Sequence, residues 1–185
     1  MVCGTIYPIL LGGIDLAVGA TAAMSGACVV LTIVKMDYSF TGVILGILFG
    51  LAAGVMAGIA HGAIVSNFNV PPFLITLASQ NIIYGIAQLL TGNQVISCLE
   101  PAAFTFLGGG RLFGIPFSVC ILVIVALISF WLLNRTTFGR QVYAVGGNKE
   151  ASNLSGVSSR RITTVSYAIS GFTAALAGIV LASMN

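Results

Sequence analysis

The sequence predicts an all-α integral membrane protein, built as a polytopic bundle of transmembrane helices. Only 6% of its 185 residues are charged and 58% are hydrophobic, whereas a soluble domain carries about 25% charged residues. Apolar stretches recur along the chain, each about 18 residues or longer, which is the length that crosses a lipid core about 30 Å thick. A water-soluble fold is therefore excluded.

We expect five full spans in one transmembrane domain of residues 1–185, preceded by a broken helix. Residues 1–16 are apolar, but Pro8 and the pair Gly12-Gly13 interrupt them. Because the chain is apolar at both ends, we expect a partial chain with further spans on either side. The expected spans are residues 17–34, 41–66, 73–90, 115–133 and 162–184.

The positive charges predict how the spans are oriented. The loop 134–161 holds five of the seven Lys and Arg residues, and cytoplasmic loops carry the excess of such residues. This loop and the turn 67–71 are then cytoplasmic, while residues 35–40 and the loop 91–114 face outward. The net charge of +3 thus reports orientation, and basic patches interleaved with aromatic residues, as nucleic-acid binders need, are absent.

Small residues predict where helices pack closely. In the second span, glycine recurs at every fourth position, at Gly42, Gly46, Gly50, Gly54, Gly58 and Gly62. Such rows allow close contact between helix backbones, and at 3.6 residues a turn the row drifts by about 40° per step. We therefore expect it to serve more than one neighbour. The last span carries a second row, Ser170, Ala174, Gly178 and Ala182.

The loop 134–161 carries signals for one short helix. The pair Gly146-Gly147 should break structure, Asn148 is a good N-cap, and Gly156 can end a helix in the left-handed conformation. Barely two turns lie between, too few for a stable isolated helix in water. We therefore expect a small cytoplasmic helix that docks on a partner.

Polar side chains within the spans are the candidates for a translocation path. Asp15 follows a helix break, where it can act as an N-cap or take a direct part in transport, and both interpretations remain open. The span 73–90 is the best pore-lining candidate, although hydrogen bonding between helices is an equal rival for any one residue. The path candidates are Asp15, Thr76, Gln80, Asn81, Tyr84 and Gln88.

Signals for catalysis, metals and cofactors are weak. The four cysteines are scattered without metal-ligand spacing, so we expect neither a metal site nor a disulfide framework. The loop 91–114 contains Gly108-Gly109-Gly110 but no nucleotide-binding pattern. A membrane enzyme would have to use Asp15 with His61, whose spacing does not support it, and a packed His61 is favoured.

Three segments together resemble the permease subunits of ribose/galactose-type ABC sugar importers: residues 12–19, 69–77 and 137–157. Within the third, Glu150-Ala151-Ser152-x-x-x-Gly156 is similar to the EAA-x3-G coupling motif, with Ser152 where a second Ala is usual. The resemblance covers essentially the whole chain. The ATPase-coupling residues it implies are Gly139, Asn148, Glu150, Ala151, Leu154 and Gly156.

The resemblance also implies partners. A cytoplasmic ABC ATPase would bind and hydrolyse ATP, so that this chain binds no cofactor and catalyses no bond chemistry itself. An extracytoplasmic sugar-binding protein would deliver substrate, and a second permease copy would complete the path in the bacterial plasma membrane. The alternatives are a permease for another small polar solute, such as a pentose, inositol or a signalling furanose, and a secondary transporter.

Overall fold

The fold is a helical bundle with one short hairpin, seen in a computed structural model that describes residues 1–68, 70–94, 96, 100–112 and 114–184. The elements are α1 (Val2–Leu10), α2 (Val18–Lys35), α3 (Phe40–Phe68), α4 (Pro72–Thr91), α5 (Ala102–Gly109), β1 (Arg111–Leu112), β2 (Ile115–Pro116), α6 (Phe117–Arg135), α7 (Thr137–Gly147), α8 (Lys149–Leu154) and α9 (Ser159–Ala182). Among the described residues, five helices are long and apolar enough to cross a membrane: α2, α3, α4, α6 and α9. Each corresponds to one expected span, and the all-α polytopic fold is confirmed.

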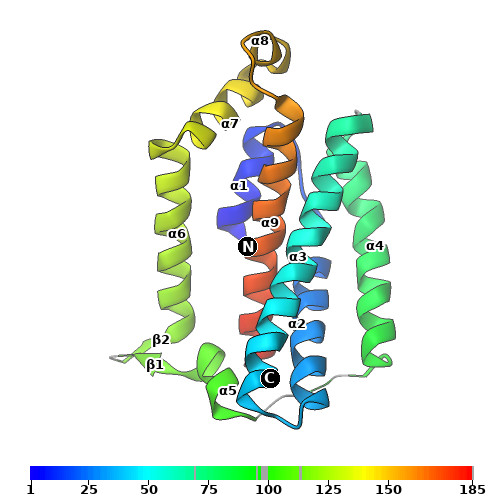
Figure 1. Ribbon diagram of the computed structural model, residues 1–185, viewed down its shortest axis with the longest axis vertical. Coiled ribbons are helices and arrows are strands. Elements are labelled where there is room, and N and C mark those ends of the chain that lie inside the picture. The colour runs from blue at the N-terminus through cyan, green and yellow to red at the C-terminus, as the bar shows by residue number, and fades with distance from the viewer. Residues whose placement is uncertain (69, 95, 97–99, 113, 185) are drawn as a thin grey trace.

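The two ends of the bundle carry different connecting elements. In Figure 1, α7, α8 and the α3–α4 turn lie at one end, whereas α5, the hairpin and the α2–α3 turn lie at the other. The basic loop and the turn at 67–71 are thus on the same side. Asn69 of that turn and Cys98 lie outside the described residues.

The N-terminal segment is broken at Gly12-Gly13, as expected, whereas Pro8 does not interrupt it but lies inside α1. Helix α1 ends at Leu10, Gly12 takes a positive φ of 76°, and α2 begins only at Val18. The non-helical segment 11–17, which we call the entry segment, runs back into the bundle toward the start of α2 (Figure 1).

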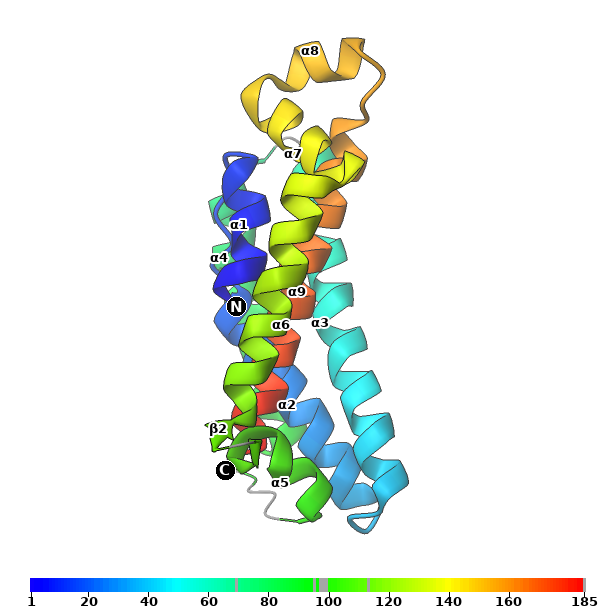
Figure 2. The same ribbon diagram turned by 90° about the vertical axis from the view of Figure 1, so that its left-hand side faces the viewer.

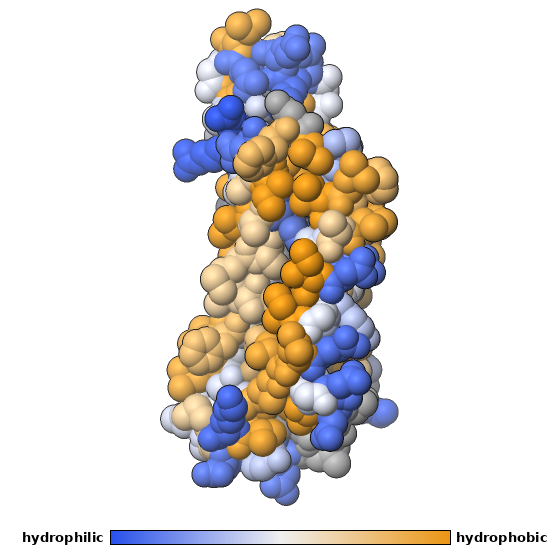
Figure 3. Space-filling view, turned by 90° about the vertical axis from the view of Figure 1, so that its right-hand side faces the viewer, coloured by the Kyte–Doolittle hydropathy of each residue, from blue (hydrophilic) through white to orange (hydrophobic). Residues whose placement is uncertain are grey.

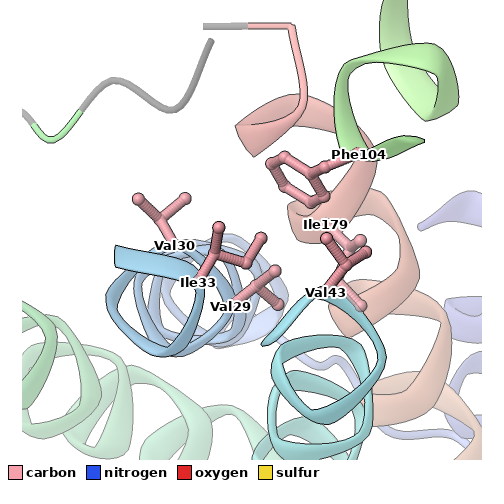
Figure 4. Close-up of a cluster of buried hydrophobic side chains, with 6 residues drawn as sticks. All are labelled: Val29, Val30, Ile33, Val43, Phe104 and Ile179. Atoms are coloured by element: carbon pink, nitrogen blue, oxygen red, sulfur yellow. The ribbon is translucent and has the colours of Figure 1, made fainter. Parts of the chain in front are cut away.

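The loop 91–114 contains structure that the sequence analysis did not predict. Helix α5 occupies Ala102–Gly109, and β1 pairs antiparallel with β2, with Leu112 opposite Ile115. Phe104 explains the short helix, because its side chain is fully buried. Figure 4 shows this ring beside Val43 and Ile179, in a cluster that joins α5 to α2, α3 and α9.

The glycine row of α3 does serve two neighbours. A β-carbon placed on Gly46 or Gly50 would lie 2.9 Å from a backbone oxygen of α2, that of Val29 or Ser25 respectively. Further along, one placed on Gly54 would lie 2.7 Å from the Gly171 oxygen of α9. The row therefore passes from α2 to α9 as it winds round the helix, which confirms the prediction. Of the second row, Ser170, Ala174 and Gly178 are buried.

Candidate coupling surface and translocation path

The basic loop 134–161 contains two helices where one was expected. Helix α7 precedes α8 and ends at the pair Gly146-Gly147, so the predicted break falls between the two helices. The helix forms because one face is packed: Val142 and Val145 are buried with Ile162 of α9, and Leu10 and Leu11 pack against them. The sequence analysis did not predict α7, because tertiary burial here overrides weak local propensity.

Gly139 lies at the corner between α6 and α7. Its amide donates to the Thr136 hydroxyl over 3.2 Å, which caps α7. A β-carbon there would lie 2.6 Å from the Leu132 carbonyl oxygen, so only glycine fits this corner. Gly139 is buried and sets the direction of α7. It does not belong to the exposed surface of α8.

Both ends of α8 carry the predicted signals. The Asn148 side-chain oxygen accepts a hydrogen bond from the Ala151 amide over 2.9 Å. At the other end, the amides of Gly156 and Val157 donate to the carbonyls of Asn153 and Ser152 over 3.1 and 3.0 Å, with Gly156 at φ 84°. This pairing is a Schellman motif, which satisfies carbonyls that the helix leaves free.

The face that α8 presents is exposed and partly apolar. Ser152 is buried, whereas Glu150, Ala151 and Leu154 are exposed, and Leu154 is 90% exposed. In Figure 2, α8 projects beyond the ends of the long helices. We call Glu150, Ala151 and Leu154 the α8 surface. Its capped ends fix its shape, and its apolar side chain lacks cover from the described residues.

The path candidates on α4 divide into two groups. Thr76 is fully buried, and its hydroxyl donates to the Ile14 carbonyl over 3.2 Å as well as to its own helix. This bond ties Thr76 of α4 to the non-helical entry segment. The others are exposed: Gln80, Asn81, Tyr84 and Gln88. Figure 3 shows polar side chains along one side of this face, beside an apolar stripe.

A cavity of about 700 Å³ adjoins this polar face, between α2, α4 and the end of α9. Small residues of α2 line one side, among them Gly19 and Ala23, while Tyr84 and Thr91 line the other. A second cavity of about 240 Å³ shares Tyr84 and adds Gln88. The size of the larger cavity suits a small solute, because ligand sites commonly measure about 300–1,000 Å³.

Asp15 is not the N-cap of α2, although the sequence analysis offered it as one. The N-cap is Ala17, two residues later, and no side chain bonds to the first turn. Instead, Asp15 Oδ1 accepts from the Ala17 amide over 3.1 Å and Oδ2 accepts from the Ser170 hydroxyl over 2.7 Å. The side chain is only 8% exposed. A buried carboxylate needs such partners, and here one of them comes from α9.

His61 lies on α3, 4% exposed and within electrostatic range of Asp15. Tyr167 of α9 is also within that range. The sequence analysis considered Asp15 and His61 together only as an enzyme pair and did not include Tyr167, because these side chains come from three elements far apart in the chain. Within the described ranges, no group of three or more His, Cys, Asp or Glu residues is placed to hold a metal ion.

The chain is similar to permease components of known transport systems. The chain is 38% identical to the ribose import permease RbsC of Bacillus subtilis over 181 residues, which cover 97% of this chain and 55% of that protein. It is 35% identical to the L-arabinose permease AraH of Escherichia coli (98% and 54% covered) and 36% identical to the galactofuranose permease YtfT (97% and 51%). No solved structure matches. The chain thus spans about half the length of these relatives.

These relatives confirm the resemblance to permeases of sugar importers. They are components of transport systems, which agrees with a transport role for this chain. The family model that matches residues 3–185 is described as the permease component of branched-chain amino acid transport systems. With 183 of 185 positions inside that match, the chain belongs to this permease family.

Proposed function

We propose that this chain is the membrane permease part of an ATP-driven sugar importer in the bacterial plasma membrane. The observation that carries the proposal is the α8 surface. It is a helix of six residues, capped at both ends, that projects from the bundle and exposes 90% of Leu154. A helix so short has little stability of its own. Docking of its exposed apolar side chain in a groove of a cytoplasmic ATPase gives this helix a function.

The polar face of α4 supports the transport half of the proposal. Four exposed polar side chains on a membrane-spanning helix need hydrated or polar surroundings. Sugars carry many hydroxyls, which amide and phenol groups bind through hydrogen bonds. Gln80, Asn81, Tyr84 and Gln88 therefore form the wall of the path, beside the cavity that Tyr84 lines. The sugars of the relatives indicate the substrate class, a pentose or hexose.

The proposal also assigns a role to each partner protein. ATP binds to and is hydrolysed by the cytoplasmic ATPase, and this chain contributes the path and the surface that the ATPase contacts. A sugar-binding protein delivers substrate at the opposite face, where α5 and the hairpin lie. A second permease copy completes the path opposite the exposed polar face of α4.

Transport in proteoliposomes tests the proposal. The chain is reconstituted with the host's ATPase subunit and sugar-binding protein, and uptake of labelled ribose, L-arabinose and galactofuranose is measured with and without ATP. We expect uptake of one sugar to require ATP. Leu154→Asp should reduce it on the order of tenfold or more, because a charge replaces a desolvated apolar contact.

The control is Leu154→Met, which keeps an apolar side chain at the same 90% exposed position. This variant should keep wild-type uptake. Uptake that needs no ATP and follows an ion gradient would contradict the proposal in favour of a secondary transporter.

A further inference from the structure

The entry segment, residues 11–17, is held from two directions by the helices on either side of α8. On the cytoplasmic side it begins against α7, where Leu10 and Leu11 pack on Val142 and Val145. Helix α7 is separated from α8 by Asn148 alone. A shift of α8 that carries α7 along therefore acts directly on the start of the entry segment.

The other end of the entry segment is held by α9 and α4. Ser170 donates to Asp15 over 2.7 Å, and Thr76 donates to the Ile14 carbonyl over 3.2 Å. Helix α9 is in turn tied to α8, because the Asn153 side-chain oxygen accepts from the Ser159 amide over 3.0 Å. The α8 surface is thus connected to the entry segment by two routes, one through α7 and one through α9.

The entry segment leads directly into the wall of the cavity. Helix α2 begins at Val18, and Gly19, Ala22 and Ala23 of its first turns line the 700 Å³ cavity. Thr76, which holds Ile14, belongs to α4, whose Tyr84 lines the opposite wall. A displacement of the entry segment therefore changes the position of α2 relative to α4.

Tyr167 of α9 places a buried hydroxyl beside the entry segment. Its side chain is 1% exposed, and its hydroxyl has no hydrogen-bond partner among the described residues. Ser170 follows Tyr167 by three residues on the same helix, so both side chains lie on one face of α9. A β-carbon placed on Gly13 would lie 2.6 Å from the Tyr167 hydroxyl oxygen, which puts this hydroxyl against the entry segment.

An unpaired buried hydroxyl is costly and therefore needs an explanation. We propose that Asp15 exchanges its hydroxyl donor from Ser170 to Tyr167 when α9 moves with α8, and that this exchange links the α8 surface to the cavity. The exchange gives the entry segment two discrete arrangements. Energetic coupling between distant sites requires such a two-state element. Asp15, Ser170 and Tyr167 are positioning residues in this scheme, which rests on the proposed function.

His61 completes the surroundings of the carboxylate from α3. It lies where the glycine row of α3 contacts α9, since a β-carbon on Gly62 would lie 2.6 Å from the Thr164 Cα. Among the described residues, the titratable side chains that interact electrostatically with Asp15 are His61 and Tyr167.

Tyr167→Phe separates this role from a structural one. Among the described residues the hydroxyl has no hydrogen-bond partner, so its removal should not lower thermal stability and should leave binding of the ATPase unchanged. It should nevertheless lower ATP-driven sugar uptake in proteoliposomes on the order of tenfold, within the usual range of coupling effects. The control, Tyr38→Phe, changes a 41% exposed tyrosine in the outer turn and should transport normally.

Hydrogen–deuterium exchange gives the second readout, on the same reconstituted complex. In the wild type, exchange at the Ala17 amide, which donates to Asp15, should differ between the nucleotide-free and the vanadate-trapped complex. In Tyr167→Phe this difference should vanish. Wild-type uptake and an unchanged exchange difference in Tyr167→Phe would overturn the donor exchange alone. A wild-type chain that binds no ATPase would overturn the proposed function and, with it, this inference.

Discussion

Gly54→Leu should unfold much of the bundle. A β-carbon at this position would lie 2.7 Å from the Gly171 backbone oxygen of α9 and 3.2 Å from the Ser25 hydroxyl of α2. A backbone atom cannot rotate away, so α9 would have to separate from α3, whose close contact holds the bundle together. We expect a loss of about 3 kcal/mol or more, the upper range for overpacked cores. Thermal unfolding in detergent micelles, together with the yield of monodisperse protein, measures this loss.

Gly85→Leu is the matched control. Gly85 also lies within a membrane-spanning helix, α4, but a β-carbon there meets no atom within 4 Å. This variant should unfold at the wild-type temperature. If both variants were equally stable, close packing along the α3 row would not be what holds the bundle.

Gly156→Leu should unfold α8 without disturbing the membrane spans. A β-carbon at Gly156 meets no atom within 4 Å, so the effect comes from the backbone alone. Leucine at φ 84° costs about 1–2 kcal/mol. A six-residue helix has too little stability of its own to stay folded against this cost. Hydrogen–deuterium exchange of the amides of residues 149–157 should accelerate, and thermal unfolding of the bundle should stay unchanged.

Gly147→Leu provides the comparison. Gly147 closes α7 just before α8, and a β-carbon there also meets no atom within 4 Å, but its φ is not in the left-handed region. It should therefore leave the exchange of α8 amides at wild-type rates. Equal protection of α8 in both variants would show that the Schellman motif does not hold this helix.

The parts of the fold that follow from local signals were predictable. Each spanning helix has an apolar run long enough for the membrane, and Asn148 and Gly156 act on α8 through bonds within a few residues. Helices α5 and α7 were missed because tertiary burial creates them. The ring of Phe104 fills the outer core, and Val142 finds its partners on α1 and α9.

The surroundings of Asp15 could not be predicted in the same way. Its bond to Ser170 joins residues 155 positions apart, and no spacing within a single helix reveals such a pair. The sequence analysis singled out Asp15 because of the helix break, and it noticed Ser170 only as a small residue in a packing row. Tyr167 carried no signal at all, since an aromatic residue in an apolar span resembles ordinary core.

Binding of the host's ABC ATPase to the α8 surface tests the central claim most directly. The chain is purified in detergent, wild type beside the double variant Glu150→Lys/Gly156→Leu, and the ATPase retained by each is quantified. We predict retention by the wild type and its loss in the variant, with thermal unfolding of both chains alike. No retention by the wild type, or equal retention by both, would contradict the claim that α8 couples this permease to an ATPase.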